Sequence, residues 1–287
     1  MPSKLDRFCA AWQRMPAYAC PVCGQTMKLS GMSLTCGKGH SFNVNKKGCV
    51  NFLTRKSESF YNEELFAARR RVFLSGCYLP VVQAMDDLLS EGTRCILDAG
   101  CGEGWYLNEI LARHPESCGA GIDLSKDAII QATDQPCDAL WTVGDLRRLP
   151  FVSGTFDAVL NVLTPAAYHE FARVLSPSGV LIKVYPGREY LRQLREARGL
   201  PLYEEGDVAA HLSASAVIER TIHVAACQPV TEALWADVVS MSPINQDLTA
   251  QEKEEIARQP AKEITIDLWV TRCRLPEQQR SEQIDQT

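Results

Sequence analysis

The sequence has no long hydrophobic run and no dense set of cysteines. Its 287 residues contain no stretch of roughly 18 or more apolar residues, so we expect no membrane-spanning helix. The first twenty residues carry charges at Lys4, Asp6, Arg7 and Arg14 and lack the apolar core of a secretory signal peptide. The twelve cysteines make up only about 4% of the chain, well below the density of a disulfide scaffold. These absences predict a cytoplasmic protein whose thiols are reduced.

Basic residues are in the minority overall, but not at the N-terminal end. The chain has a formal net charge of −5, whereas residues 1–60 hold nine lysines and arginines against two acidic side chains. That segment therefore carries +7, and the rest of the chain carries −12. A basic end on an acidic body predicts a polyanionic partner that is bound by one part of the molecule. A merely solvated basic surface is the alternative.

Two close pairs of metal-binding side chains stand near the N-terminus. The pattern is Cys-x2-Cys-x12-Cys-x3-His, formed by Cys20, Cys23, Cys36 and His40. Soft ligands at this spacing are typical of a structural zinc site, because four protein ligands close the tetrahedral shell of the metal. A redox Cys-x-x-Cys is the alternative, but it belongs to a βαβ context that this segment lacks. The sequence therefore predicts one structural zinc ion per chain.

A glycine-rich stretch follows an apolar run in the larger part of the chain. Residues 95–99 read as a strand, glycines stand at 100, 102 and 104, and an amphipathic helix follows. Such glycines let the backbone turn sharply and let a nucleotide-like ligand approach the main chain. A dinucleotide fingerprint needs a further glycine where Trp105 stands, which disfavours NAD. An ordinary strand-to-helix turn is the alternative.

Three acidic residues mark three successive apolar runs. Asp98 lies in the first run, Asp123 closes the second and Asp145 closes the third. The carboxyl ends of parallel strands meet at one edge of an open α/β sheet, and ligands bind outside that edge, at the point where the strand order switches. We therefore expect these carboxylates to surround one ligand.

Strand and helix patterns alternate through most of the chain. We expect helices over 63–74, 79–89, 126–133, 166–175, 189–198 and 231–241, and strands over 95–99, 118–124, 139–145, 156–163, 179–185, 216–225 and 263–273. A capping box at Thr249 and Glu252 opens a further helix. This order predicts an α/β fold with a doubly wound, Rossmann-like sheet. We place a zinc-binding domain at 1–60, completed by a turn and short strand over 46–53, a larger domain at 61–275, and a disordered tail at 276–287.

The glycine stretch, which reads Asp-x-Gly-Cys-Gly-x-Gly, resembles motif I of the class I S-adenosylmethionine-dependent methyltransferases. The resemblance implies that the glycines hold the carboxypropyl and sulfonium end of the cofactor, that Asp123 holds the ribose hydroxyls, and that Asp145 lies near the adenine amine. The implied cofactor-binding residues are Tyr78, Asp98, Gly100, Cys101, Gly102, Gly104, Asp123, Asp145 and Asn161.

The fourth strand ends in the stretch Asn-Val-Leu-Thr-Pro at 161–165, where methyltransferases of this class present the reacting base. Methyltransferases that act on exocyclic amines usually carry Asp/Asn-Pro-Pro-aromatic there, so its absence disfavours that reaction. Asn161 and Asp145 are the candidate catalytic residues, Glu103 and His169 are further candidates, and no base is assigned. The alternative is that Asn161 caps the strand and the residues after it form a turn.

Nearly end to end, the chain resembles the 23S rRNA guanine-N1 methyltransferases that carry an N-terminal zinc finger. The stretches at 144–150 and 240–243 are closer to the Gram-positive branch, which is linked to tylosin resistance and hence to macrolide resistance. The resemblance implies S-adenosylmethionine as cofactor, zinc on the Cys3His set, and a 23S rRNA hairpin loop as substrate. It also places Tyr78 beside the cofactor. The family often has histidine where Tyr190 stands and tyrosine at Cys49, and a homodimer is left open.

The candidates for RNA phosphate contacts are basic side chains in two parts of the chain. The first group is Lys28, Lys38, Lys46, Lys47, Arg55 and Lys56, and the second is Arg188, Arg192, Arg195 and Arg198. Two other functions remain open. One is a small-molecule methyltransferase, for which a basic zinc-binding segment would be superfluous. The other is a zinc-dependent RNA-binding protein with an inactive core, against which the intact glycines and acidic residues argue.

Overall fold

The computed structural model describes residues 2–53, 63–204 and 206–276. The expected linker at 54–62, with Arg55, Lys56 and the domain boundary at residue 60, lies outside these residues, as does the tail from 277 onward. Within the described residues, no helix has both the length and the apolar character needed to cross a membrane.

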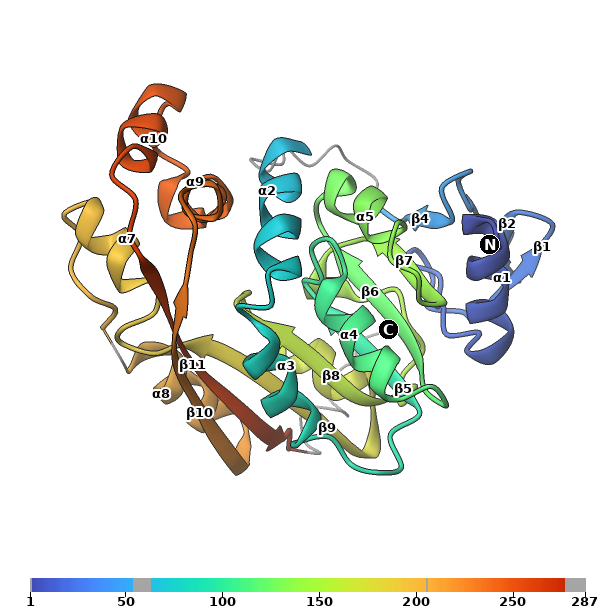
Figure 1. Ribbon diagram of the computed structural model, residues 1–287. Helices are drawn as coiled ribbons and strands as arrows, with labels where there is room; N and C mark the ends of the chain where they lie inside the picture. Colours follow the sequence, from blue (N-terminus) through green and yellow to red (C-terminus); the bar gives the residue numbers. More distant parts are fainter. Residues whose placement is uncertain (1, 54–62, 205, 277–287) are drawn as a thin grey trace.

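An eight-stranded mixed sheet forms the centre of the molecule (Figure 1). Its strands are β4 (Cys49–Asn51), β5 (Cys95–Ala99), β6 (Cys118–Asp123), β7 (Ala139–Val143), β8 (Phe156–Val162), β9 (Leu175–Pro186), β10 (Val217–Pro229) and β11 (Glu263–Arg274), in the order β10-β11-β9-β8-β5-β6-β7-β4. The strands from β9 to β4 in this order pair in parallel with their neighbours. Strand β11 pairs antiparallel with β9, and β10 pairs antiparallel with β11. Because the chain builds outward from β5 first on one side and then on the other, the switch point lies between β5 and β8. The predicted doubly wound sheet is confirmed.

Helices cover both faces of this sheet. One hydrophobic core joins it to α2 (Glu63–Leu74), α3 (Leu79–Asp86), α4 (Trp105–Arg113), α5 (Lys126–Ala132) and α9 (Glu232–Met241). A second core, on the other face, joins it to α1 (Lys4–Arg14), α6 (Tyr168–Val174) and α8 (Asp207–Ser215). Two further helices are α7 (Arg192–Ala197) and α10 (Ala250–Ala257), and two short 3-10 helices are η1 (Leu146–Arg148) and η2 (Pro243–Asn245).

Local capping explains where several of these helices begin. In α1, the Ser3 hydroxyl accepts from the Asp6 N–H while the Asp6 carboxylate accepts from the Ser3 N–H. The predicted capping box at Thr249 and Glu252 opens α10 in the same way. The expected helix over 189–198 is shorter than its pattern suggests, since it begins only at Arg192. Helix α8 was not expected from the sequence, because it buries only Leu212 and therefore shows almost no apolar periodicity.

The N-terminal cysteine-rich segment forms a separate small sheet. It consists of β1 (Met27–Ser30), β2 (Ser33–Cys36) and β3 (Ser41–Asn43), all antiparallel. We call residues 17–48 the zinc module. In the segment 46–53, where a turn and short strand were expected, β4 (Cys49–Asn51) adjoins this module through an antiparallel bridge between Val44 and Val50, and it also pairs in parallel with β7 at the edge of the main sheet. Its central residue, Val50, is fully buried there, which explains the pairing.

The zinc module packs directly on the main sheet. Tyr18 is fully buried, its hydroxyl lies 2.7 Å from the Thr142 hydroxyl on β7, and its ring stacks on Phe151 with centroids 5.4 Å apart. The Ala19 N–H donates to the Pro150 carbonyl at 3.0 Å. The module therefore draws part of its core from the larger fold, as a segment too small to bury much apolar surface must do.

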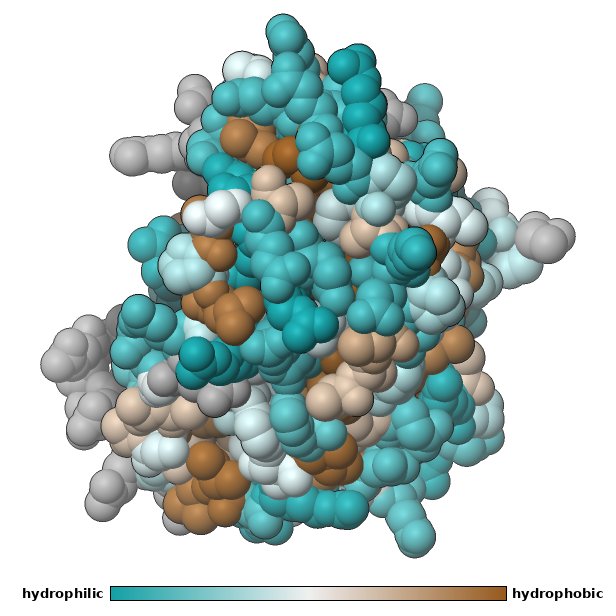
Figure 2. Space-filling model, turned by 60° about the vertical axis from the view of Figure 1, so that its left-hand side comes forward, coloured by the Kyte–Doolittle hydropathy of each residue, from teal (hydrophilic) through white to brown (hydrophobic). Residues whose placement is uncertain are grey.

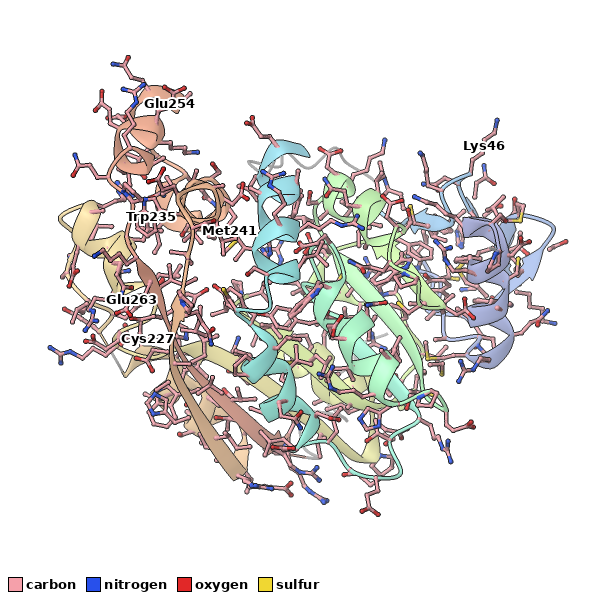
Figure 3. The ribbon with its side chains drawn as sticks, in the orientation of Figure 1. Lys46, Cys227, Trp235, Met241, Glu254 and Glu263 are labelled. Carbon is pink, nitrogen blue, oxygen red and sulfur yellow. The ribbon has the colours of Figure 1, made fainter. Side chains whose placement is uncertain are left out.

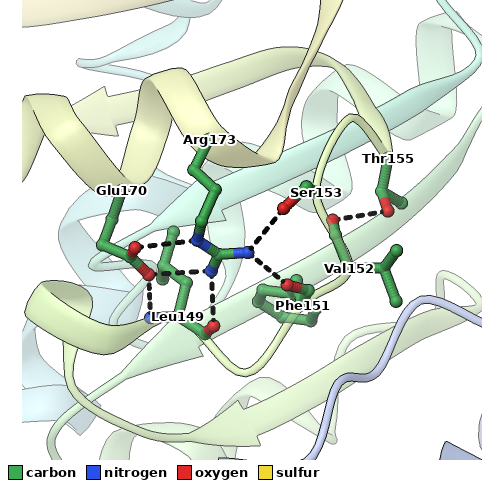
Figure 4. A network of polar contacts seen from close by, with 7 residues as sticks. All are labelled: Leu149, Phe151, Val152, Ser153, Thr155, Glu170 and Arg173. Atoms are coloured by element: carbon green, nitrogen blue, oxygen red, sulfur yellow. Dashed lines mark hydrogen bonds and ion pairs between the residues drawn. The ribbon is translucent and has the colours of Figure 1, made fainter. Parts of the chain in front are cut away.

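A buried ion pair holds the loop on which the module rests (Figure 4). Arg173 on α6 donates to the carboxylate of Glu170 and also to the carbonyl oxygens of Leu149 and Phe151, at 2.8 Å each. The Leu149 N–H in turn donates to Glu170 at 2.6 Å. Since nearly every polar atom of this pair is satisfied, the network anchors the chain between η1 and β8 to α6.

The opposite edge of the sheet is formed by β10, which is mostly exposed. Val217 and Ile218 at its start are 63% and 41% exposed. Figure 2 brings this side of the molecule forward and shows hydrophobic residues in small, separate patches among hydrophilic ones. The face in view therefore has no single large apolar area of the kind that marks an obligate interface.

Candidate functional site: a zinc cluster and a cavity at the strand ends

The four predicted metal ligands lie together in the zinc module. All their ligand atoms are within 4.8 Å of one another. The Sγ atoms of Cys23 and Cys36 are 3.7 Å apart, and Nδ1 of His40 lies 3.3 Å from Cys36 Sγ and 3.5 Å from Cys20 Sγ. In a tetrahedron with Zn–S bonds of about 2.3 Å, sulfur atoms are about 3.8 Å apart. The cluster therefore fits a zinc ion, with Nδ1 as the histidine ligand atom.

The zinc module also presents four lysines to solvent. Lys28, Lys38, Lys46 and Lys47 are all exposed, and no described acidic side chain forms an ion pair with any of them. In Figure 3, Lys46 points away from the body of the molecule. These side chains are available to a partner.

The second group of candidate RNA-binding cations is already engaged within the chain. Arg192 pairs with Glu189 at 2.9 Å, and Arg198 pairs with Asp247 at 2.8 Å. Arg195 lies over the ring of Tyr203, 4.1 Å from its centroid. Because these partners offset much of the positive charge, this region attracts a phosphate backbone less than its arginine count suggests.

A cavity of about 1130 Å³ opens along the carboxyl ends of the parallel strands. Gly100 follows β5, Asp123 ends β6, Asp145 follows β7, and Val162 ends β8; all four line the cavity. Its other walls come from α2, β9, α8 and the segment after α9, through residues such as Arg69, Tyr78, Lys183, Tyr185, Tyr190, Tyr203, His211 and Ile244. The cavity therefore lies at the switch point of the sheet, where open α/β folds bind their ligands.

The glycine turn is shaped by close contacts as well as by its backbone angles. Gly100 has φ +85°, and a Cβ at this position would lie 2.5 Å from Cγ2 of Thr164. Gly104 has φ +75°, and a Cβ there would meet the ring of Trp141 at 2.4 Å. Any larger residue would displace either the turn after β8 or the core under α4.

The Asp123 carboxylate holds this turn in place. It accepts from the Gly102 N–H at 2.9 Å and from the Ser125 N–H at 2.8 Å. Burial raises the pKa of Asp123, and these two backbone donors counteract the rise. Asp145 is more exposed, and its carboxylate pairs with Arg147 at 2.8 Å, which lowers its pKa. Asp123 is therefore built into the turn, whereas Asp145 stands at the rim of the cavity.

Several buried polar atoms beside the turn have no hydrogen-bond partner among the described residues. They are both carboxylate oxygens of Asp98, both of Glu103 and the Tyr106 hydroxyl. Burial, together with the charge of Asp123, raises the pKa of Asp98 to about 8, although the charge of Arg69 favours its ionised form. Arg69 also approaches Glu103, with its Nε 3.3 Å from Oε1. Unsatisfied buried acceptors are costly, so this corner fits a ligand that brings a cationic donor.

Two tyrosines close the cavity on the side of α3. The hydroxyls of Tyr78 and Tyr190 lie 2.8 Å apart, and both residues are buried. Burial raises the pKa of Tyr190 to about 12 and that of Tyr78 well above its ordinary value. Both side chains are therefore neutral donors and acceptors at physiological pH.

The turn after β8 carries a second polar network. Asn161 is fully buried, and its Nδ2 donates to the Ala99 carbonyl at 3.0 Å. Lys183 on β9 donates to Asn161 Oδ1 at 2.5 Å and to the Thr164 carbonyl at 2.6 Å. Leu163, between these residues, has φ +53°, and the other non-glycine residue with positive φ in the described part of the chain, Leu191, also lines the cavity. Strained backbone gathers at this site, as is typical of functional positions.

Comparison with known proteins agrees with this geometry. Residues 96–179 match the model of a family described as a methyltransferase domain, and residues 18–57 match the RlmA N-terminal zinc ribbon. The Bacillus subtilis protein YxjB, which is named as a 23S rRNA (guanine-N1)-methyltransferase, is 38% identical over 224 residues, covering 74% of this chain and 78% of the relative. The chain belongs to this family.

Further relatives of the methyltransferase extend the match. The 23S rRNA (guanine(748)-N1)-methyltransferase of Streptomyces fradiae is 28% identical over 270 residues, covering 89% of this chain and 95% of the relative. Among solved structures, the geranyl diphosphate C-methyltransferase of Streptomyces coelicolor, in complex with S-adenosyl-L-homocysteine, aligns with a TM-score of 0.45 at 15% identity, covering 77% and 83% of the two chains. The two family matches confirm the predicted methyltransferase fold and the zinc-ribbon module.

The structure brings the predicted site residues of the methyltransferase into two layers. Tyr78, Gly100, Gly102, Asp123 and Asp145 line the cavity. Four others support these from behind without lining it: Asp98, Cys101, Gly104 and Asn161. The role of each residue toward a ligand stays a prediction.

Sequence reasoning missed three cations that line the cavity, Arg69, Arg147 and Lys183. Arg69 is one of three consecutive arginines in α2, and nothing in the sequence distinguishes it from its neighbours. Lys183 interrupts an otherwise apolar strand, flanked by Ile182 and Val184. A lone charge within a buried strand was the signal that could have identified it.

Proposed function

We propose that this chain transfers a methyl group from S-adenosylmethionine to N1 of a guanine in a hairpin loop of 23S rRNA. The observation that carries the proposal is the cavity at the switch point, with Gly100 and Asp123 in its wall and a zinc module beside the same sheet. The functions for which the relatives from Bacillus subtilis and Streptomyces fradiae are named supply the substrate.

The residues around the glycine turn suit the parts of this cofactor. Arg69, which approaches Glu103, would pair with its carboxylate, while the buried carboxylates of Asp98 and Glu103 beside the turn favour its ammonium group. Asp123 has lone pairs left for the ribose hydroxyls, and Asp145 would lie near the adenine. The bound cofactor would supply an electrophilic methyl group, and the chain would orient it toward the turn after β8.

The cavity has room for a nucleobase as well. Its volume of about 1130 Å³ exceeds the roughly 300–1,000 Å³ typical of a pocket for one small ligand. The wall beyond the Leu163 turn carries aromatic side chains, Tyr168, Tyr185 and Tyr203, on which a base can stack. A base must leave its stack to enter such a cavity, which favours a loop over a continuous duplex.

The zinc module is the part that we expect to bind the RNA backbone. Its four lysines are exposed and unpaired among the described residues, whereas Arg192, Arg195 and Arg198 have partners within the chain. We therefore assign RNA affinity to the predicted domain at 1–60, which contains the zinc module, and the chemistry to the predicted domain at 61–275.

Primer extension on 23S rRNA tests this function. A methyl group at N1 blocks Watson–Crick pairing, so the purified protein with S-adenosylmethionine should create one new stop at a guanine in a hairpin loop. The Asp123→Ala variant serves as the control, because its weaker cofactor binding should reduce the stop when S-adenosylmethionine is limiting. If the protein instead methylates only small molecules, or binds the hairpin without ever producing a stop, the proposal is wrong.

Three finer predictions follow from the same proposal. A protein that modifies ribosomal RNA acts where ribosomes are assembled, so we place it in the cytoplasm.

Resemblance to the tylosin-resistance branch predicts that expression of the protein raises macrolide tolerance, which growth assays on tylosin measure. Whether the protein is a homodimer is a separate question that sedimentation analysis tests. The face shown in Figure 2 has no large apolar area that would support a dimer.

A further inference from the structure

Lys183 is a buried lysine in the wall of the cavity, and no carboxylate among the described residues pairs with it. It is 4% exposed, lies on β9, and belongs to the walls of the cavity beside Thr164 and Pro165. Its Nζ donates to two neutral acceptors, Asn161 Oδ1 and the Thr164 carbonyl. A neutral amine has two N–H bonds, and these two acceptors use both. The lone pair would then occupy the remaining tetrahedral direction.

The groups around Lys183 do little to hold it charged. Cys273 approaches it from β11, Tyr168 lies on α6 and Tyr185 lies on β9 itself. From α8, Asp207 and His211 line the same cavity, and no described carboxylate lies within ion-pair distance of Nζ. Burial lowers the pKa of Lys183 to about 8, so a substantial fraction is neutral near physiological pH.

We propose that Lys183 is the proton acceptor of the methyl transfer and takes the proton that leaves guanine N1. The inference rests on the proposed function and deepens it. As the N1–C bond forms, the bond between sulfur and the methyl carbon breaks and its electron pair stays on sulfur. The N1–H electron pair remains with the ring, and the proton forms a third N–H bond on Lys183. The ammonium then returns the proton to solvent.

The location of Lys183 agrees with this role. It lies under the turn after β8, which touches the glycine turn through the close contact of Thr164 and Gly100. The same two hydrogen bonds could instead make Lys183 a clamp that only positions this turn. A clamp and a base differ in one respect, because only a base depends on the free amine.

Two variants separate these roles. Lys183→Ala leaves room for a small amine, whereas Lys183→Met has no amine and fills the same space. Single-turnover methylation of the rRNA hairpin would be measured with both, from about pH 6 to about pH 10, with and without methylamine. Wild-type activity in the same assay establishes the proposed function by itself, and calorimetry with S-adenosylmethionine reports whether each variant keeps a folded cofactor site.

We expect both variants to lose roughly 100- to 10,000-fold in rate at neutral pH, the range usual for a missing general base. The wild-type rate should rise with pH and level off near the pKa of the amine. Methylamine should restore Lys183→Ala in proportion to its free-base concentration and leave Lys183→Met unchanged. The inference is overturned if Lys183→Met stays within about threefold of the wild type, or if rescue follows the ammonium form instead of the free base.

Discussion

The zinc cluster and the cavity differ in how far apart their residues lie in the chain. The four zinc ligands fall between positions 20 and 40, on two turns joined by a hairpin. The cavity is built from residues between Phe66 and Ile244, which meet only when the sheet is assembled. A local site can thus be predicted from spacing alone, whereas a distributed site is known from sequence only where its residues happen to lie in a motif.

The two basic regions make a second contrast. The zinc module and the Arg188–Arg198 segment each carry several cations, yet the lysines of the module are solvent-exposed and the arginines mostly have partners. Counting charges therefore does not show which surface can bind a phosphate backbone. The predictions below test both contrasts.

The largest effect should come from removing a zinc ligand. Cys20→Ser is expected to abolish the structural zinc ion, and with it a stabilisation of about 10 kcal/mol or more for the module. Because Tyr18 and its neighbours share a core with the main sheet, thermal unfolding of the whole chain should also shift downward. Elemental analysis and calorimetry measure the two effects.

Cys227→Ser is the matched control, since Cys227 is exposed on β10, on the far side of the molecule from Lys46 (Figure 3). It should keep one zinc per chain and the parent melting temperature. Full zinc content in Cys20→Ser would contradict the assignment of the ligand.

A smaller effect is expected from neutralising the module's lysines. Replacing Lys28, Lys38, Lys46 and Lys47 by glutamine should weaken hairpin binding and flatten its salt dependence, by up to about 0.9 in the log–log slope for each phosphate that the module no longer neutralises. Cofactor affinity should not change. A salt titration of binding, by fluorescence anisotropy, provides the measurement.

The comparison variant replaces Arg192, Arg195 and Arg198 by glutamine. Because these side chains are already engaged within the chain, its salt slope should stay near that of the parent, whereas its stability should fall slightly. If the arginine variant loses RNA affinity and the lysine variant does not, the division between module and core is wrong.

The smallest effect concerns the cavity. Asp123→Ala removes the acceptor for the Gly102 and Ser125 N–H groups, and the expected loss of S-adenosylmethionine affinity is about 1–3 kcal/mol by calorimetry. Asp127→Ala, at an exposed position four residues on, should bind the cofactor like the parent. Unchanged affinity in Asp123→Ala would show that the cofactor does not depend on this turn.

Sequence periodicity located most strands and helices, and it failed where tertiary contacts decided the outcome. Strand β4 is only three residues long, and its partner β7 lies about ninety residues away, so no local pattern could reveal the pairing. Helix α8 buries only Leu212, through which it forms against the core. The turn after β8 was expected, but its bonds to Lys183 join two strands and were not.

The sequence by itself determined the zinc ligands, the glycine turn and the acidic ends of three strands. These features depend on local backbone geometry and on short spacings, which the order of residues specifies directly. Only the tertiary structure decided that Asp98 is buried beside the glycine turn, that Lys183 is buried at the cavity, and that, among the described residues, the arginines after β9 have partners while the module's lysines form no ion pair. Burial and pairing depend on which segments pack together, and that arrangement sets both the pKa of a buried group and the charge available on a surface.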